Sequence, residues 1–316
     1  MPVGQLNACL QKEFIMRVGV PHSGGKLALH AFNKDYPVMV SAAAFWNRQK
    51  ERFHMPEFTD LSETDFALDS AGFTAISGWG KKGKQRGMAG IFPWTVGEYL
   101  EFASMSGARW FSQPDMCCEQ EIAANADEVN YRIRATATLL EGLLRTLYAW
   151  QNELAKSCNS TTVANMLRPC VPVIQGRTID DYKFSMELML DVWSRWEPWL
   201  APPQLIGIGS MCRRDLLDPN QGLLAILDGV KEFVPAGSKV HIFGAKGTAL
   251  PHLSQMDFVL SSDSMAHDFA TRMSSRKAGV SNTMDRRMAG MTEWMEAAFA
   301  RINPTVERHQ FELLAT

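Results

Sequence analysis

The feature that most constrains the fold is an alternation of short apolar runs with longer segments of helical periodicity. Several runs are bounded by Gly, Pro or Ser, which is typical of buried parallel strands. The alternation predicts an α/β fold with a parallel sheet. The predicted strands are YPVMVSAA (36–43), DFALD (65–69), ARWFS (108–112), CVPVIQG (170–176), PQLIGIGS (203–210), KVHIFGAK (239–246) and MDFVLSSD (256–263). Helical periodicity is clearest in VNYRIRATATLLEGLLRTLYAW, DDYKFSMELMLDVWSRW, QGLLAILDGVKEF and MTEWMEAAFARI.

Seven strands with crossover helices favour a (β/α)8 TIM barrel with insertions over a doubly wound sheet. The 316 residues exceed the typical barrel size of about 250, and the pattern does not locate the eighth strand. No G-x-G-x-x-G motif opens a helix after the first strand, which argues against a dinucleotide site. We therefore expect residues 1–316 to form a single barrel domain.

The charge balance limits how the chain could bind a polyanion. Lys and Arg number 32 against 34 Asp and Glu, so the formal net charge is −2. The whole chain is not a polycation, and nucleic-acid binding would need a local basic surface.

Cysteine spacing and the N-terminus bear on metal binding and location. The six cysteines include no C-x-x-C or C-x-C pair, which argues against a structural zinc site. The N-terminal MPVGQLNACLQKEF has no basic run followed by an apolar core, so it does not resemble a secretory signal. No stretch is apolar and long enough to cross a bilayer. We expect a cytoplasmic protein with reduced thiols and no membrane partner.

Polar residues and glycines gather at the ends of the predicted strands. In a parallel barrel these ends converge on one face, where barrel enzymes place their chemistry. Each residue alone has a simpler explanation, such as a helix cap or an Asx turn for an aspartate. Several at successive strand ends indicate a site. They are Asp69, Asp115, Glu119, Gln175, Gly176, Gly207, Gly209, Ser210 and Asp263.

Four short motifs carry a resemblance to a known family. DSAGF, PVIQGR, LIGIGS and SSDSMAH resemble, in order, motifs of the tRNA-guanine transglycosylase superfamily, whose fold is a (β/α)8 barrel. The chain lacks that family's C-x-C-x-x-C zinc motif. FSQPDMCCE, SDSMA and RKAGVSNTMDRR are more similar to the DpdA-like branch, the 7-deazaguanine DNA transglycosylases of phages and bacteria.

The resemblance implies an activity and a set of residue roles. The enzyme would replace guanine in DNA with a 7-deazaguanine, such as 7-cyano-7-deazaguanine, through a covalent aspartyl–sugar intermediate, in DNA hypermodification that protects from restriction. Asp263 is implied as the nucleophile and Asp69 as the general acid/base. The implied base-binding residues are Ser70, Phe73, Gln175, Gly207, Gly209 and either Asp115 or Glu119.

The same resemblance sets the expected cofactors and partners. No cofactor and no zinc are expected, and the free deazaguanine base is a co-substrate. The partners are DNA and that base, with a homodimer as an option, in the host cytoplasm if the protein is phage-encoded. Exchange on tRNA, a non-catalytic barrel subunit that binds nucleic acid, and an unrelated small-molecule barrel enzyme remain as alternatives.

Two basic clusters lie next to the candidate catalytic loops. They could be solvated surface, but their position favours contacts to phosphates. The first follows DSAGF and contains Lys81, Lys82, Lys84 and Arg86. The second follows Asp263 and contains Arg272, Arg276, Lys277, Arg286 and Arg287.

Overall fold

A curled, fully parallel sheet of seven strands forms the centre of the protein. The structure is a computed structural model, and it describes residues 14–55 and 60–303. The strand order is β5-β2-β1-β9-β8-β7-β6. The strands are β1 (Ile15–Val20), β2 (Val38–Ser41), β5 (Phe66–Asp69), β6 (Val173–Ile174), β7 (Leu205–Ile208), β8 (Lys239–Ile242) and β9 (Val259–Ser264). Two further short strands, β3 (Trp46–Asn47) and β4 (Arg52–Phe53), form a separate antiparallel pair.

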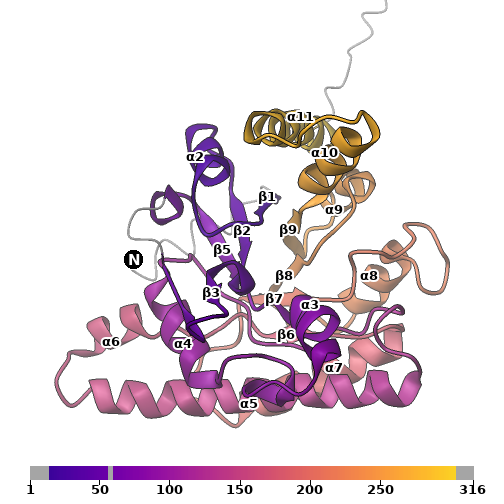
Figure 1. Cartoon of the computed structure of the whole chain (residues 1–316). Coiled ribbons are helices and arrows are strands. Elements are labelled where there is room, and N and C mark those ends of the chain that lie inside the picture. The colour runs from indigo at the N-terminus through magenta and orange to yellow at the C-terminus, as the bar shows by residue number, and fades with distance from the viewer. Residues whose placement is uncertain (1–13, 56–59, 304–316) are drawn as a thin grey trace, which may run out of the picture.

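Helices surround this sheet (Figure 1). They are α2 (Lys26–Asn33), α3 (Gly72–Thr74), α4 (Val96–Met105), α5 (Ala126–Leu154), α6 (Ser160–Met166), α7 (Ile179–Ser194), α8 (Leu223–Lys231), α9 (Leu250–Leu253), α10 (Ala266–Lys277) and α11 (Met284–Ile302). All four predicted helices are present, as α5, α7, α8 and α11. α11 begins at Met284, seven residues before the predicted segment, because Thr283 accepts the Arg286 N–H and caps the helix there.

The strand that sequence patterning did not locate is β1. Its sequence IMRVGV contains Arg17, which is only 1 % exposed. The Arg17 guanidinium reaches Asp65, with Nη1 3.1 Å from Oδ1, and it also donates to the Asp65 carbonyl at 2.9 Å. Asp65 directly precedes β5, so the buried charge of Arg17 is compensated by a residue next to another strand of the same sheet. β1 pairs with β2 on one side and with β9 on the other.

The predicted strand at 108–112 is not a regular strand, and the expected closed eight-stranded barrel is corrected to a curled, barrel-like sheet of seven. Only two isolated parallel bridges occur there, Leu68 with Phe111 and Ser112 with Val171. The pairing of this segment with β6 stops because the Gln113 side chain, and not a backbone carbonyl, accepts the Val173 N–H at 3.0 Å. Pro114, which follows Gln113, has no N–H to continue the pairing.

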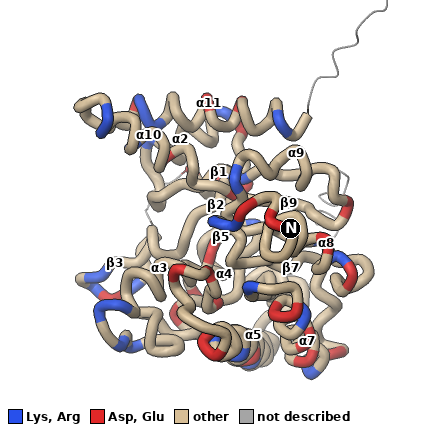
Figure 2. Tube along the Cα trace, turned by 90° about the vertical axis from the view of Figure 1, so that its right-hand side faces the viewer, with Lys and Arg blue, Asp and Glu red and all other residues tan. Residues whose placement is uncertain are grey.

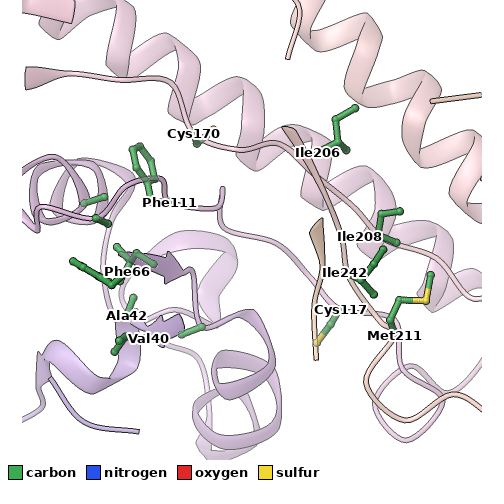
Figure 3. Close-up of a cluster of buried hydrophobic side chains, with 14 of the residues drawn as sticks. Val40, Ala42, Phe66, Phe111, Cys117, Cys170, Ile206, Ile208, Met211 and Ile242 are labelled. Carbon is green, nitrogen blue, oxygen red and sulfur yellow. The ribbon is translucent and has the colours of Figure 1, made fainter. Parts of the chain in front are cut away.

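One connected apolar cluster runs from β1 to α11. Figure 3 shows part of it, with Phe66 and Phe111 on one side and Ile206, Ile208 and Ile242 on the other. α5 contributes a buried stripe at helical spacing. No helix in the described ranges is long and apolar enough to cross a membrane. The N-terminal stretch discussed above, Cys9 included, lies outside the described residues except for Phe14.

Candidate active site

The predicted polar residues do come together where the parallel strands end. Asp69 is the last residue of β5, Gln175 directly follows β6, and Asp263 is the penultimate residue of β9. Asp263 therefore lies within a strand, and α10 begins after Met265, so capping of that helix does not explain the aspartate. The sequence predicted this convergence, and the structure confirms it for the carboxylates and the amide.

Asp69 is a carboxyl group held in a poorly solvated position. Its Oδ2 accepts the Ala71 N–H at 3.0 Å, which is the local turn contact that an aspartate favours. Burial raises the pKa of Asp69 to about 6, and the nearby Asp263 carboxylate adds to this rise. Asp69 can therefore exchange a proton near neutral pH.

A buried hydrogen-bond network surrounds Asp115. The Ser70 hydroxyl donates to Asp115 Oδ1 at 2.7 Å, and the Gln175 side-chain amide donates to Oδ2. Ser210 donates to Gln175 Oε1 at 2.5 Å. Burial raises the pKa of Asp115 to about 7, with the Asp69 and Glu119 carboxylates contributing. Two predicted base-binding groups, the Asp115 carboxyl and the Gln175 amide, are thus held in direct contact.

Glu119 stands at the outer end of this network. Its Oε2 lies 3.4 Å from the Ser210 hydroxyl, and the residue is partly exposed. Ser210 itself has φ 58°, in the left-handed region, and its hydroxyl also accepts the Cys118 N–H at 2.6 Å. Sequence reasoning noted Ser210 only as a strand end and missed its role in joining the β7 end to the Cys117–Cys118 segment.

Three glycines near the site are required by close approach, and two of them adjoin the Asp115 network. A Cβ on Gly209 would lie 2.1 Å from Gln175 Nε2, and a Cβ on Gly72 would lie 2.7 Å from Asp115 Oδ1. Any larger residue would displace the network. Gly207 faces Phe243 in the same way, with 2.5 Å from its Cβ position to Cε2. Gly209 was predicted as a base-binding position, and the structure adds that it leaves room for Gln175.

Asp263 lies beside a buried histidine. The Gly244 N–H donates to Asp263 Oδ1 at 2.8 Å, and His241 Nε2 is 3.4 Å from the same oxygen. His241 is fully buried, its Nδ1 lies 2.8 Å from the Ser261 hydroxyl, and burial lowers the pKa of the imidazole. Sequence reasoning gave His241 no role in the site. The strand alternation of KVHIFGAK, which turns every second residue to one side, was the signal that could have found it.

Phe73 follows the turn after Asp69 and is 39 % exposed. The guanidinium carbon of Arg213 lies 5.5 Å from the Phe73 ring centre, a cation–π distance. Arg213 also lines a polar cleft of about 220 Å³ together with Glu119 and Ser210. The predicted stacking residue therefore lies beside a cleft that borders the site.

The thiols near the site are not poised as nucleophiles. Cys117 and Cys118 are both buried, and burial raises the pKa of each well above its ordinary value. They act as small apolar side chains. Within residues 14–55 and 60–303, no group of three or more His, Cys, Asp or Glu side chains is arranged to hold a metal ion.

The basic residues differ in how far they are already engaged. Arg287 is buried and its Nε is 2.6 Å from Asp268 Oδ1, and Arg272 is 3.1 Å from the other oxygen of that carboxylate. Arg86 is paired with Glu98 at 2.7 Å. The other residues of the two clusters are exposed: Lys81, Lys82, Lys84, Arg276, Lys277 and Arg286. Figure 2 shows the Lys and Arg positions along α10 and α11 at the top of the molecule, above α3.

A family comparison fits this arrangement. The family model DpdA, described as DeoxyPurine in DNA protein A, matches residues 44–303. The chain belongs to the DpdA family. The comparison with curated proteins gave no match. Membership in the DpdA family ties the chain to the modification of deoxypurines in DNA and makes DNA its substrate. Every carboxylate described above lies inside the matched range.

Proposed function

We propose that this chain exchanges guanine in DNA for a 7-deazaguanine base. The observation that carries the proposal is the cluster of neighbouring carboxyl groups where the parallel strands end. In this cluster, Asp69 and Asp115 have pKa values raised to about 6 and about 7. Base exchange at a sugar needs one carboxylate as nucleophile and a second group that moves protons. A binding protein needs no proton donor beside a second carboxylate.

In the first step, an Asp263 oxygen forms a bond to C1′ of the deoxyribose while the C1′–N9 bond breaks. The bonding electrons leave with guanine, and protonated Asp69 supplies the proton that neutralises the departing base. The Gly244 N–H, 2.8 Å from Asp263 Oδ1, orients the attacking carboxylate.

In the second step, the free deazaguanine enters the vacated slot and loses its N9 proton to the Asp69 carboxylate. N9 then attacks C1′, the C1′–oxygen ester bond breaks, and Asp263 is released as a carboxylate. The new nucleoside forms with retained configuration, because two displacements have occurred at one carbon.

The base would be recognised by the network already described. Asp115 accepts hydrogen bonds from Ser70 and Gln175, and a guanine-like edge offers N–H donors of the same kind. Gln175 both donates and accepts, so it can pair with a base carbonyl. Of the two carboxylates that the sequence left open, Asp115 is favoured because it is buried among these groups, and Glu119 lies at the rim. Phe73, Ser70, Gly207 and Gly209 complete the proposed slot.

The architecture supports one barrel-like domain around this slot. Because Phe111 bridges to Leu68 of β5 and Ser112 bridges to Val171, shortly before β6, we include residues 108–112 in the proposal as an irregular additional strand of a TIM-like fold.

The test is nucleoside mass spectrometry after incubation of the purified protein with guanine-containing DNA and, in separate reactions, 7-cyano-, aminomethyl- and formamidine-substituted deazaguanine. We expect a deazaguanine deoxynucleoside in DNA with one of these bases, and none with Asp263→Ala. Parallel reactions with tRNA are the substrate control. Incorporation into tRNA alone, or full incorporation by the Asp263→Ala protein, would contradict the proposal.

A further inference from the structure

One face of α10 carries exposed apolar and cationic side chains together. Met265, which immediately precedes α10, and Phe269 and Met273 within it are spaced four residues apart and are 40 %, 62 % and 47 % exposed. At about 100° per residue, they share one side of the helix with Arg272 and Arg276. Lys277 lies at the edge of that side. We call this surface the α10 face.

Two charges of the α10 face, those of Arg276 and Lys277, are not balanced by an acidic residue of the same helix, whereas Arg272 is paired with Asp268. The sole acidic residue of α10 is Asp268, which is 2 % exposed and already paired with Arg287 and Arg272. Among the ion pairs of the described residues, none involves Arg276 or Lys277. A cationic surface with apolar side chains between the charges complements a polyanion that also offers apolar rings.

The α10 face begins at the candidate active site. Met265 is two residues after Asp263 along the chain. It packs against the end of β1, because a Cβ on Gly19 would lie 2.1 Å from Met265 Cγ. From Met265 to Met273 the helix rises by ~12 Å, which leads outward from the strand ends. A strand whose target nucleotide occupies the site would therefore pass over this helix.

Resting on the function proposed above, we infer that the α10 face binds the DNA strand next to the target nucleotide. Phe269 stacks on an unstacked base of that strand, and Arg276 and Lys277 contact its phosphates. Removing the target base from a duplex costs a few kcal/mol, and stacking of a neighbouring base on an aromatic ring offsets part of that cost.

The experiment compares two fluorescein-labelled single-stranded oligodeoxynucleotides of equal length, one with ordinary guanine-containing sequence and one built of abasic sites. We expect Phe269→Ala to weaken binding of the first by about 5- to 160-fold, the range for removal of one stacked base, and to leave binding of the abasic strand unchanged. Arg276→Gln with Lys277→Gln should weaken binding of both strands and reduce the salt slope by about 0.7 for each phosphate neutralisation that is removed.

The matched control is Tyr131→Ala. Tyr131 is an aromatic residue of similar exposure, 60 %, near the start of α5, a helix at the opposite end of the molecule from α10 in both views (Figures 1 and 2). The control variant should bind both oligonucleotides like the wild type.

Three results would overturn the inference: unchanged binding by Phe269→Ala, equal weakening on the abasic strand, or a wild-type dimer that Phe269→Ala converts to a monomer, which would assign the face to a second copy of the chain. Base exchange is scored separately. If Phe269→Ala weakens DNA binding but the wild type shows no base exchange, only the proposed function is contradicted. If the wild type exchanges bases normally but Phe269→Ala leaves DNA binding unchanged, only the inference about the α10 face is contradicted.

Discussion

At the scale of single residues, the site depends on carboxyl groups whose proton affinities are set by burial and by one another. Asp69 is near Asp263, and Asp115 is near Asp69 and Glu119, so each negative charge makes the next ionisation harder. The pKa values of Asp69 and Asp115 are therefore properties of the assembled site. Replacing one member changes the protonation of the others.

Asp69→Asn tests the proton-transfer role. The asparagine keeps the shape and can still accept the Ala71 N–H, but it cannot move a proton to the departing guanine, so exchange should fall by about 10²- to 10⁴-fold. Free deazaguanine should bind nearly as well as to the wild type, measured by calorimetry. In the wild type, exchange limited by proton donation should decline as pH rises through about 6, where Asp69 loses its proton. An equal reduction of base binding and turnover would instead assign Asp69 to recognition.

His241→Phe tests whether the buried imidazole positions Asp263. The ring volume is kept, but the Nε2 atom 3.4 Å from Asp263 Oδ1 is removed. Nε2 lies outside hydrogen-bond geometry with Asp263, so the contact contributes less than the about 1.5–3 kcal/mol of a hydrogen bond to a charged group, and we expect saturated turnover to fall by about 10-fold or less with DNA affinity unchanged. Ser261→Ala, which removes the partner of Nδ1, should show a smaller fall in turnover. Unchanged turnover in the phenylalanine variant, with the fold intact by circular dichroism, would leave His241 a core residue only.

At the scale of elements, the loop after β5 carries both chemistry and charge. Asp69 ends the strand, Ala71 turns in the left-handed region with φ 70°, and a short helical stretch leads to the lysines. The loop that begins with DSAGF thus connects the Asp69 carboxyl group to the cationic segment that starts at Lys81, 12 residues later. Base selection and backbone contact are expected to respond together to changes in this loop.

Neutralising Lys81, Lys82 and Lys84 to glutamine tests the phosphate-binding prediction. Because the chain has a formal net charge of −2, attraction to DNA must come from local cations. We expect weaker DNA binding and a salt slope reduced by roughly 0.7–0.9 for each phosphate that is no longer neutralised, measured by anisotropy over a salt series. Turnover at saturating DNA should change little.

The control for that loop is a pair of exposed lysines on other helices, Lys183 on α7 and Lys231 on α8. Their replacement by glutamine should leave the salt slope as in the wild type. If the loop variant and this control behaved alike, the loop would be ordinary solvated surface.

Much of the sheet followed from sequence, because β2, β5, β7, β8 and β9 are short apolar runs between turn residues. β1 did not, because Arg17 interrupts its apolar pattern, and its compensating partner Asp65 is 48 residues away. The segment at 108–112 was predicted as a full strand because local pattern does not reveal that the Gln113 side chain takes the place of a backbone acceptor.

The site was predictable to the extent that parallel strands must end on one face. Asp69, Gln175 and Asp263 were found for that reason. Ser210 was found as a strand end, but its contact with Cys118 was not, because its backbone turns to φ 58° and Cys118 is 92 residues distant in the chain. The engagement of Arg287 with Asp268 was also hidden, since a basic run looks the same whether or not its charges are already compensated.

At the scale of the whole molecule, the raised pKa of Asp115 links the site to stability. Its pKa is about 7 in the folded protein and 3.8 as the reference for an unfolded chain. The folded state binds the proton more tightly, so this stabilisation is fully present below about pH 4 and is lost as pH rises through about 7. The contribution is roughly 4 kcal/mol at most, at about 1.4 kcal/mol per pKa unit.

Asp115→Asn isolates that contribution. Removal of one acceptor for Ser70 or Gln175 lowers the stability of the variant at every pH. As pH rises from 4 to 8, the wild type loses the stabilisation that protonated Asp115 provides and the variant does not. The variant's deficit in unfolding free energy should therefore become smaller over this range. Urea unfolding at several pH values measures it. A difference that does not vary with pH would show that Asp115 does not hold its proton in the folded state.

The pairing of β1 with β9 has a consequence for how the protein is made. The ribosome delivers β1 before any other described strand and β9 after all of them, so the centre of the sheet cannot close until β9 has emerged. A nascent chain that ends between residues 175 and 263 has Asp69 and Gln175, the amide proposed to bind the base, but lacks the aspartate proposed to attack the sugar. Incomplete translation products therefore lack the proposed chemistry, which becomes available only when the first and last described strands pair at the centre of the sheet.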